Sequence, residues 1–155
     1  ITPDGNGSIT LSVNPAVAQD AALNDNTAAA PVTTIYDATA PSVLIQGAPA
    51  YTNNLSAYTV TFQFSEPVTG FTIGDIGFTN ASVSNFVAVD GDTYTADVTP
   101  DGNGNITLSV NAAVAQDAAL NDNTAAAPVT TIYDDDAPSV LIQGAPAYTN
   151  NLSAY

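Results

Sequence analysis

The sequence contains no Lys, Arg or His, against fourteen Asp and one Glu, so its formal net charge is −15 at pH 7. No ion pair between side chains can form. The carboxylates must therefore be solvated, protonated or neutralised by cations from outside the chain. The same charge excludes nucleic acid and anionic membrane surfaces as partners, because their phosphates would be repelled.

Cysteine is absent as well, together with Met and Trp. Without Cys and His the chain cannot build disulfide, zinc, haem or iron–sulfur sites, which leaves hard cations with oxygen ligands, such as Ca²⁺. No apolar run reaches the roughly 18–20 residues that cross a bilayer, so we expect no membrane insertion. Since the chain begins without Met or a leader sequence, we expect it to be an interior part of a longer polypeptide.

A long repeat dominates what is present. Residues 1–58 recur as residues 98–155, 97 positions further on, with five substitutions: Ile1/Val98, Ser8/Asn105, Pro15/Ala112, Ala38/Asp135 and Thr39/Asp136. Adjacent copies this similar are typical of proteins that gain length by adding units, and an enzyme rarely needs them. We therefore expect a structural protein without catalytic activity.

The hydrophobic pattern alternates with a period of two and predicts an all-β protein. One period contains seven expected strands, at Ser42–Gln46, Tyr58–Phe64, Ile76–Thr79, Val83–Val89, Thr93–Val98, Ile106–Val110 and Pro128–Tyr133. Seven short strands in 97 residues predict an immunoglobulin-like β-sandwich, large enough to bury one core without disulfides. In this sandwich Val60, Phe62 and Phe64 would share one face. Only Val114–Leu120 is expected to form a helical turn.

The recurring sequence YD-x-x-AP is the expected boundary between repeats. It divides the chain into the C-terminal part of one repeat (1–36), a complete repeat (37–133) and the N-terminal part of the next (134–155). Neither partial repeat is long enough to bury a core alone. Two explanations follow: the polypeptide continues in both directions, or partial repeats of different chains complete each other by exchanging strands.

Strands that alternate in direction bring alternate loops to the same end of a sandwich. The end that receives the incoming linker is predicted to collect seven acidic residues, Asp37, Glu66, Asp75, Asp90, Asp92, Asp117 and Asp122. Two carboxylates ~4 Å apart repel by about 1 kcal/mol in water and by about 4 kcal/mol at an effective dielectric constant of 20. Calcium would relieve this repulsion, because it takes roughly 6–8 oxygen ligands at about 2.3–2.6 Å.

The opposite end is expected to bring Asp101 and Asn103 close to Asp134–Asp136 of the outgoing linker. A cation shared across such a junction would stiffen it. The predicted metal ligands are Asp37, Glu66, Asp75, Asp117, Asp122, Asp134 and Asp20, the counterpart of Asp117 in the preceding copy. Tight turns at Asp-Gly and Asn-Gly pairs are a sufficient explanation for the remaining polar loop residues, Asp90, Asp92, Asp101 and Asn103.

Four segments of the complete repeat point to a family: FSEPVTGFTIGDI, VDGDTYTADVTPDGNGNITLSV, AQDAALNDNTAA and the YD-x-x-AP linker. Together they resemble the bacterial Ig-like repeats of giant secreted adhesins and other surface proteins. The resemblance implies an all-β Ig-like fold, an extracellular location on the bacterial surface, and calcium ligation at Glu66, Asp75 and Asp117. One position departs from the family pattern, since Leu120 stands where DAAGN has a glycine that would ease a tight turn.

The sequence therefore predicts an extender of a long extracellular bacterial adhesin or surface fibre, in which each repeat contacts its neighbours in the chain and calcium stiffens the domain ends. The alternative is a filament subunit whose chains self-associate into fibres by strand exchange. A third class, an enzyme or sugar-binding module, could use Glu66 and Asp75 as acid and base in glycoside hydrolysis. The repeat has no Trp to form a sugar platform, so we do not expect an enzyme.

Overall fold

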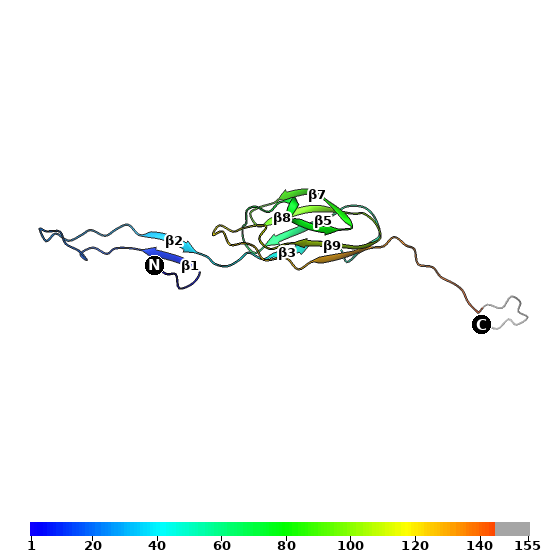
Figure 1. Ribbon diagram of the computed structural model, residues 1–155, viewed down its shortest axis with the longest axis horizontal. Helices are drawn as coiled ribbons and strands as arrows, with labels where there is room; N and C mark the ends of the chain where they lie inside the picture. The colour runs from blue at the N-terminus through cyan, green and yellow to red at the C-terminus, as the bar shows by residue number, and fades with distance from the viewer. Residues whose placement is uncertain (145–155) are drawn as a thin grey trace, which may run out of the picture.

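Two β-sheets pack face to face between residues 37 and 133 of the computed structural model, which describes residues 1–144. An extended hairpin precedes the sandwich at one end, and the chain leaves the other end as an extended linker (Figure 1). The hairpin consists of β1 (Gly7–Leu11) and β2 (Val32–Tyr36), which pair antiparallel. No helix among the described residues is long and apolar enough to cross a bilayer.

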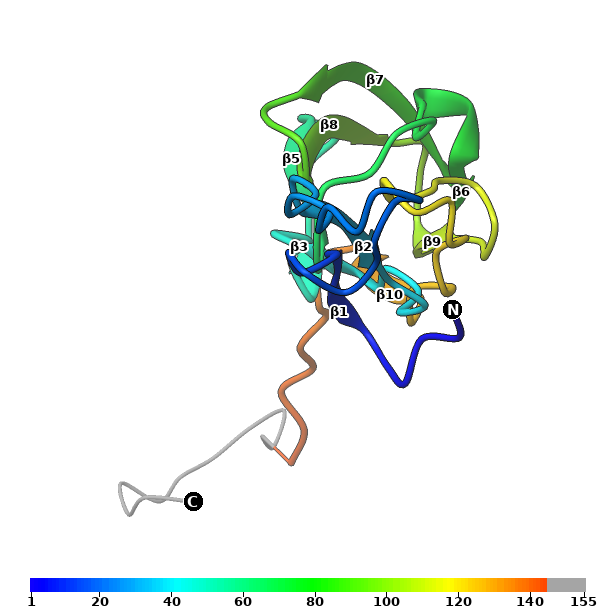
Figure 2. The same ribbon diagram turned by 90° about the vertical axis from the view of Figure 1, so that its left-hand side faces the viewer.

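The first sheet has the strand order β3-β5-β8-β7, and all neighbours in it are antiparallel. Its strands are β3 (Val43–Gln46), β5 (Tyr58–Phe64), β8 (Thr93–Pro100) and β7 (Ala81–Ala88). The second sheet has the order β4-β10-β9-β6, formed by β4 (Tyr51–Thr52), β10 (Val129–Tyr133), β9 (Gly104–Val110) and β6 (Ile76–Thr79). Figure 2 shows β7, β8, β5 and β3 along one side of the fold and β6, β9 and β10 along the other.

All seven predicted strands are present, and the all-β Ig-like sandwich is confirmed. The prediction missed β4, whose two residues pair in parallel with the end of β10, because so short a strand has no alternating pattern. The helical turn expected at Val114–Leu120 was wrong. This segment forms turns around an isolated bridge at Gln116, and the only helix among the described residues is a 3-10 turn, η1, at Ile73–Asp75.

The core follows the predicted alternation. Alternate residues of β5, β8 and β9 form the buried core: Val60, Phe62, Phe64, Tyr94, Ala96, Val98, Ile106, Leu108 and Val110. Phe71 packs at the centre of an aromatic group, with ring centroids 5.2 Å from Phe64, 5.2 Å from Tyr94 and 5.7 Å from Phe86. Such tilted and edge-on pairs add about 0.5–1.5 kcal/mol each to the burial of their area.

The same sequence occurs in this chain both inside and outside a packed sandwich. Comparing the two copies shows which strands need packing in order to form. Val43 in β3 is 3 % exposed, whereas its counterpart Val140 is 93 % exposed. The strand expected near Ser139–Gln143 is not formed, because none of the described residues pairs with that segment as β5 pairs with β3. A β-strand of this length needs a partner strand to form. The rest of this partial repeat, which was expected to lead toward its second strand, lies outside the described residues.

Candidate metal centre

Two loops of the complete repeat and its incoming linker bring three acidic side chains together. Asp37, Glu66 and Asp117 each offer a carboxylate oxygen, and these oxygens all lie within 4.8 Å of one another. Two opposite ligands of one calcium ion are separated by about twice the calcium–oxygen distance, or roughly 5 Å. The three oxygens therefore have the spacing of ligands to a single ion of that size.

Backbone pairing between two loops fixes this geometry. Thr69 and Gln116 exchange two hydrogen bonds, of 2.8 Å from the Thr69 N–H and 3.0 Å from the Gln116 N–H. This bridge joins the loop that follows β5 to the long connection between β9 and β10. It places Glu66, two residues beyond the end of β5, beside Asp117.

Asp117 is held in one orientation by its own loop. Its Oδ1 accepts the backbone N–H groups of Ala119 at 2.8 Å and Asn121 at 2.9 Å, and its Oδ2 accepts the Asn121 side-chain amide at 2.8 Å. These bonds, led by the one from the Asn121 side chain, lower the pKa of Asp117, although its side chain is only 3 % exposed. Asp117 is therefore a preoriented carboxylate that stays ionised near neutral pH.

Asp37 connects the linker to the repeat. Its Oδ1 accepts hydrogen bonds from the Asn6 side chain at 2.8 Å and the Thr39 N–H at 2.9 Å. Its backbone carbonyl accepts the Asn121 side-chain amide at 3.1 Å. The same Asn121 amide thus contacts Asp37 and Asp117, and the linker carboxylate is fixed over the repeat.

Glu66 differs from the other two because no donor among the described residues satisfies its carboxylate. Partial burial, followed by the negative charges of Asp37 and Asp117, raises the pKa of Glu66. Its ionised form is thus less favourable than in water, and the chain has no Lys, Arg or His to stabilise it. The arrangement can accept a hard cation through three carboxylates.

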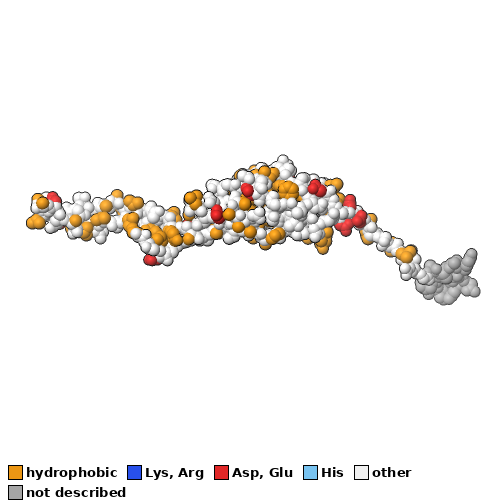
Figure 3. Space-filling view, in the orientation of Figure 1, with side chains coloured by type: hydrophobic (Ala, Val, Ile, Leu, Met, Phe, Trp, Pro, Cys, Tyr) orange, Lys and Arg blue, Asp and Glu red, His pale blue; other side chains and the backbone are white. Residues whose placement is uncertain are grey.

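The other predicted ligands lie elsewhere. The carboxylate of Asp75 caps η1, where its Oδ2 accepts the Thr72 N–H at 2.8 Å and the Thr72 hydroxyl at 2.7 Å. Asp122 is exposed and accepts the Gln116 amide at 2.8 Å. Asp134 lies at the far end of the sandwich, where Figure 3 shows acidic side chains grouped at the outgoing linker. The structure does not bring these three together with the centre.

Asp20 repeats the local geometry of Asp117 in the preceding copy. Its Oδ1 accepts the N–H groups of Ala22 at 2.9 Å and Asn24 at 3.0 Å, and the Asn24 side chain lowers the pKa of Asp20. Among the described residues no counterparts of Asp37 and Glu66 accompany it. The loop therefore forms by itself, but the three-carboxylate cluster needs the complete repeat.

The acids at Asp90 and Asp92 are used by their turn, as the Asp-Gly explanation anticipates. Asp90 Oδ1 accepts the N–H groups of Asp92 at 3.1 Å and Thr93 at 2.8 Å, which lowers the pKa of Asp90. Asp92 Oδ1 accepts the Gln63 side-chain amide at 2.9 Å. Neither carboxylate reaches the centre.

Two asparagines outside the predicted set of metal ligands also build the site. Asn121 joins Asp117 to the linker, as described above, and Asn123 is buried beneath the connection between β9 and β10. Asn123 Oδ1 accepts the N–H groups of Val114 and Ala115, while its amide donates to the carbonyls of Asn111 and Thr124. The intact copying of NDNTAAAP in both repeats was the available signal for this framework.

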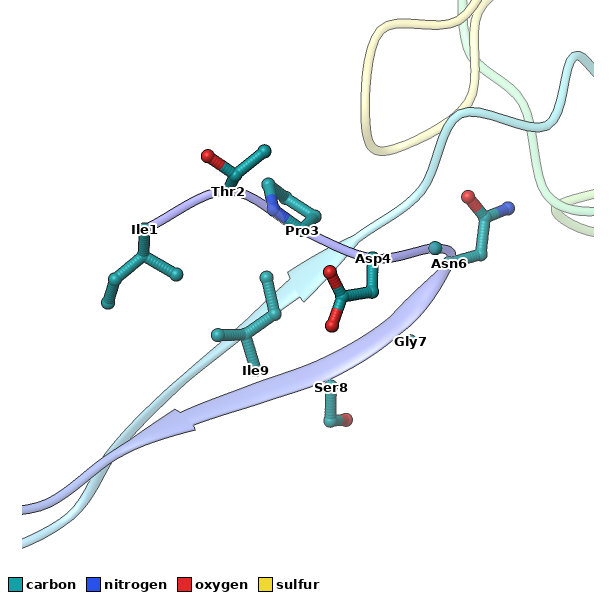
Figure 4. A pocket seen from close by; sticks show the side chains of 9 residues that line it. Ile1, Thr2, Pro3, Asp4, Asn6, Gly7, Ser8 and Ile9 are labelled. Atoms are coloured by element: carbon teal, nitrogen blue, oxygen red, sulfur yellow. The ribbon is translucent and has the colours of Figure 1, made fainter.

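Two hollows flank the incoming linker. One borders the centre and is lined by Ile35, Asp37, Glu66, Pro67, Ala118 and Ala119, so its walls are partly apolar. The other lies beside β1 and is lined by residues 1–9, with Asp4 as its single carboxylate (Figure 4). One carboxylate offers too few ligands for calcium, so the second hollow is not a candidate calcium site.

The strand order and the packed sheets define an immunoglobulin-like β-sandwich, the class implied by the sequence resemblance. The family model of the bacterial Ig-like domain matches residues 37–133, and the chain belongs to this family. No curated protein and no solved structure matches the chain. Bacterial Ig-like domains are structural, non-catalytic units that are typically extracellular or surface-associated.

Proposed function

We propose that this chain is an extender of a long extracellular bacterial adhesin or surface fibre, and that calcium stiffens the junctions between its repeats. The observation that carries the proposal is the mixed origin of the three carboxylates. Asp37 belongs to the linker, whereas Glu66 and Asp117 belong to the body of the repeat. An ion bound to all three would tie the linker to the sandwich.

The neighbouring oxygens supply further ligands for such an ion. Rotating the Asn121 amide by half a turn would direct its Oδ1, in place of its nitrogen, toward Asp117 and the Asp37 carbonyl. The bound ion would also offset the partial burial and the repulsion from Asp37 and Asp117 that raise the pKa of Glu66. Carboxylate, amide and carbonyl oxygens are the ligands that calcium takes in proteins.

Thermal unfolding with and without calcium tests this proposal. A ligand that binds only the folded state adds about 2.7 kcal/mol at a hundredfold excess over its Kd, which raises Tm by roughly 10–20 °C for a domain of about 100 residues. We expect this rise between chelator and millimolar calcium, and we expect Glu66→Gln to abolish it.

Asp97→Asn is the matched control, because Asp97 lies on β8 and bonds Thr59 and Asn85 away from the centre. It should keep the full calcium response. Equal melting curves in chelator and calcium at matched ionic strength would refute the calcium centre. Small-angle scattering of multi-repeat chains then tests whether calcium stiffens the junctions. The maximum dimension of the chains should grow linearly with the number of repeats in calcium.

Strand exchange into filaments is the second candidate, and one observation favours it. The hairpin β1–β2 has nearly the sequence of β9–β10 but leaves Leu11 exposed, whereas its counterpart Leu108 is buried. A second chain could cover this face. Sedimentation of the 155-residue chain discriminates the two candidates, because strand exchange predicts concentration-dependent oligomers and an extender predicts a monomer.

A further inference from the structure

We propose that consecutive repeats also dock through a metal-free contact, in which the asparagine of the turn PDGNG binds the backbone of the linker and sets the direction of the next repeat. The residues are Asn6 at the first junction and Asn103 at the second. The partner of this surface is the next copy of the same repeat. At the first junction the contact shares Asp37 with the metal centre, but its hydrogen bonds hold the linker without an ion.

At the first junction both ends of the Asn6 amide are used. Its Oδ1 accepts the backbone N–H of Ala38 at 3.0 Å, and its Nδ2 donates to Asp37 Oδ1 at 2.8 Å and to the Thr39 hydroxyl. Thr39 closes the turn with its own N–H on Asp37 Oδ1. One side chain of the preceding repeat thus holds three successive linker residues.

The second junction repeats the backbone part of this contact with different linker side chains. Asn103 Oδ1 accepts the N–H of Asp135 at 3.0 Å, and the N–H of Asp136 bonds Asp134 Oδ1 at 2.9 Å. Asp135 and Asp136 replace Ala38 and Thr39 of the first linker. The contact survives both substitutions because it uses the linker backbone.

The turn itself aims the asparagine at the linker. Gly104, which follows Asn103, has a φ of 130°, and Gly7 after Asn6 has a φ of 141°, values that residues with a side chain rarely adopt. The glycine reverses the chain at the start of β9, whose first residue pairs with Tyr133 at the end of β10. Asn103 therefore always lies beside the point where the linker leaves the sheet.

Further contacts hold the linker from both repeats and leave little slack. On the outgoing side the N–H of Asp134 bonds the Thr52 carbonyl at 3.0 Å and continues the pairing of β4 with β10. On the receiving side Asn121 binds the Asp37 carbonyl, and the N–H of Thr124 binds the Pro41 carbonyl at 2.8 Å. The outgoing contact is seen at the second junction and the receiving contacts at the first, and at each junction the asparagine, Asn103 or Asn6, binds the linker backbone.

Distances between spin labels in two complete tandem repeats test the proposal. The repeat is suited to this because residues 37–133 contain its whole buried core and the chain has no Cys to interfere with labelling. Ser82, exposed on β7, is changed to Cys in each repeat. In chelator, we expect a narrow distance distribution that broadens at least about twofold when the first repeat carries Asn103→Ala, since a freed linker samples many directions.

Asn105→Ser is the matched control, because Ser8 already stands at that position in the other copy. It should leave the distribution narrow, and Asn103→Ala should leave the Tm of each repeat unchanged, which separates docking from folding. An equally narrow distribution for Asn103→Ala in chelator would overturn the proposal, as would a broad distribution for the unaltered chain in chelator. Because these measurements exclude calcium, failure of the metal centre would appear separately, as a Tm that calcium does not change.

Discussion

Asn123 and Asn26 make the same four hydrogen bonds, although Asn123 is buried under a sandwich and Asn26 lies in a copy without one. Each Oδ1 accepts two successive backbone N–H groups, and each amide donates to two backbone carbonyls. The connection that carries the candidate metal ligand therefore owes its shape to local hydrogen bonds. The core adds burial to a loop that is already formed.

Asn123→Ala should lower the free energy of unfolding of the complete repeat by about 3 kcal/mol, because it leaves several buried backbone groups without partners. Urea titration followed by circular dichroism measures this loss. Asn26→Ala removes the same four bonds where no core depends on them, and it should leave the transition unchanged. A similar loss in both variants would contradict the separation of loop and core.

Leu120→Gly should stabilise the repeat by about 0.5–1 kcal/mol, because Leu120 adopts a φ of 68° that costs a residue with a side chain more than it costs glycine. Its side chain is 73 % exposed, so little apolar burial is lost. Leu44→Gly in β3 is the control and should destabilise, since that exposed residue lies in a regular strand. A fall in Tm for Leu120→Gly would refute the strain.

Glu66→Gln should raise Tm in chelator at pH 7 and lower it in calcium. The folded state raises the pKa of Glu66, so the folded state loses stability as pH climbs from about 4.3 through the raised value, and the neutral amide escapes this loss. Melting curves in chelator between pH 4 and 7 should therefore converge for the two proteins at the acid end. Parallel curves across this range would contradict the assignment.

Asp117→Asn should lower Tm in chelator as well as in calcium, unlike Glu66→Gln. The folded state lowers the pKa of Asp117, so its ionised form contributes stability above its ordinary pKa, and that contribution is lost as pH falls through the lowered value. The variant should therefore differ most from the original chain at neutral pH. Asp20→Asn, with the same local bonds in the preceding copy, is the control and should leave Tm unchanged.

The strands were predictable because their side chains alternate over four or more residues, as in β5 and β8. The alternating pattern did not predict the turns at Val114–Leu120, where two conformations compete. Ala and Leu in Val114–Leu120 favour a helix, but the side chains of Asp117 and Asn123 bind the backbone N–H groups there and hold it in turns. Side-chain bonds to the backbone offer such segments an alternative to the helix.

The location of the acidic end was predictable from strand direction, whereas its membership was not. Strand alternation brings Asp37, Glu66 and Asp117 to one end, as expected. Asp75 and Asp122 were expected at the same end, but their carboxylates lie outside the cluster. Those two carboxylates are taken by Thr72 and Gln116 within their own loops. The geometry of the loops decides which carboxylates lie within reach of one ion, and a strand pattern contains no information about it.

Asn6 and Asn103 each accept the backbone N–H of one linker residue, so the side chain of that residue takes no part in the contact. Ala38 fills that position at one joint and Asp135 at the next, beside Thr39 and Asp136. The two linker positions can therefore change from neutral to doubly negative while the bond from the asparagine to the linker backbone is kept. If consecutive repeats dock as proposed, an array can vary the charge of its linkers from one end to the other without losing the contact that sets their direction.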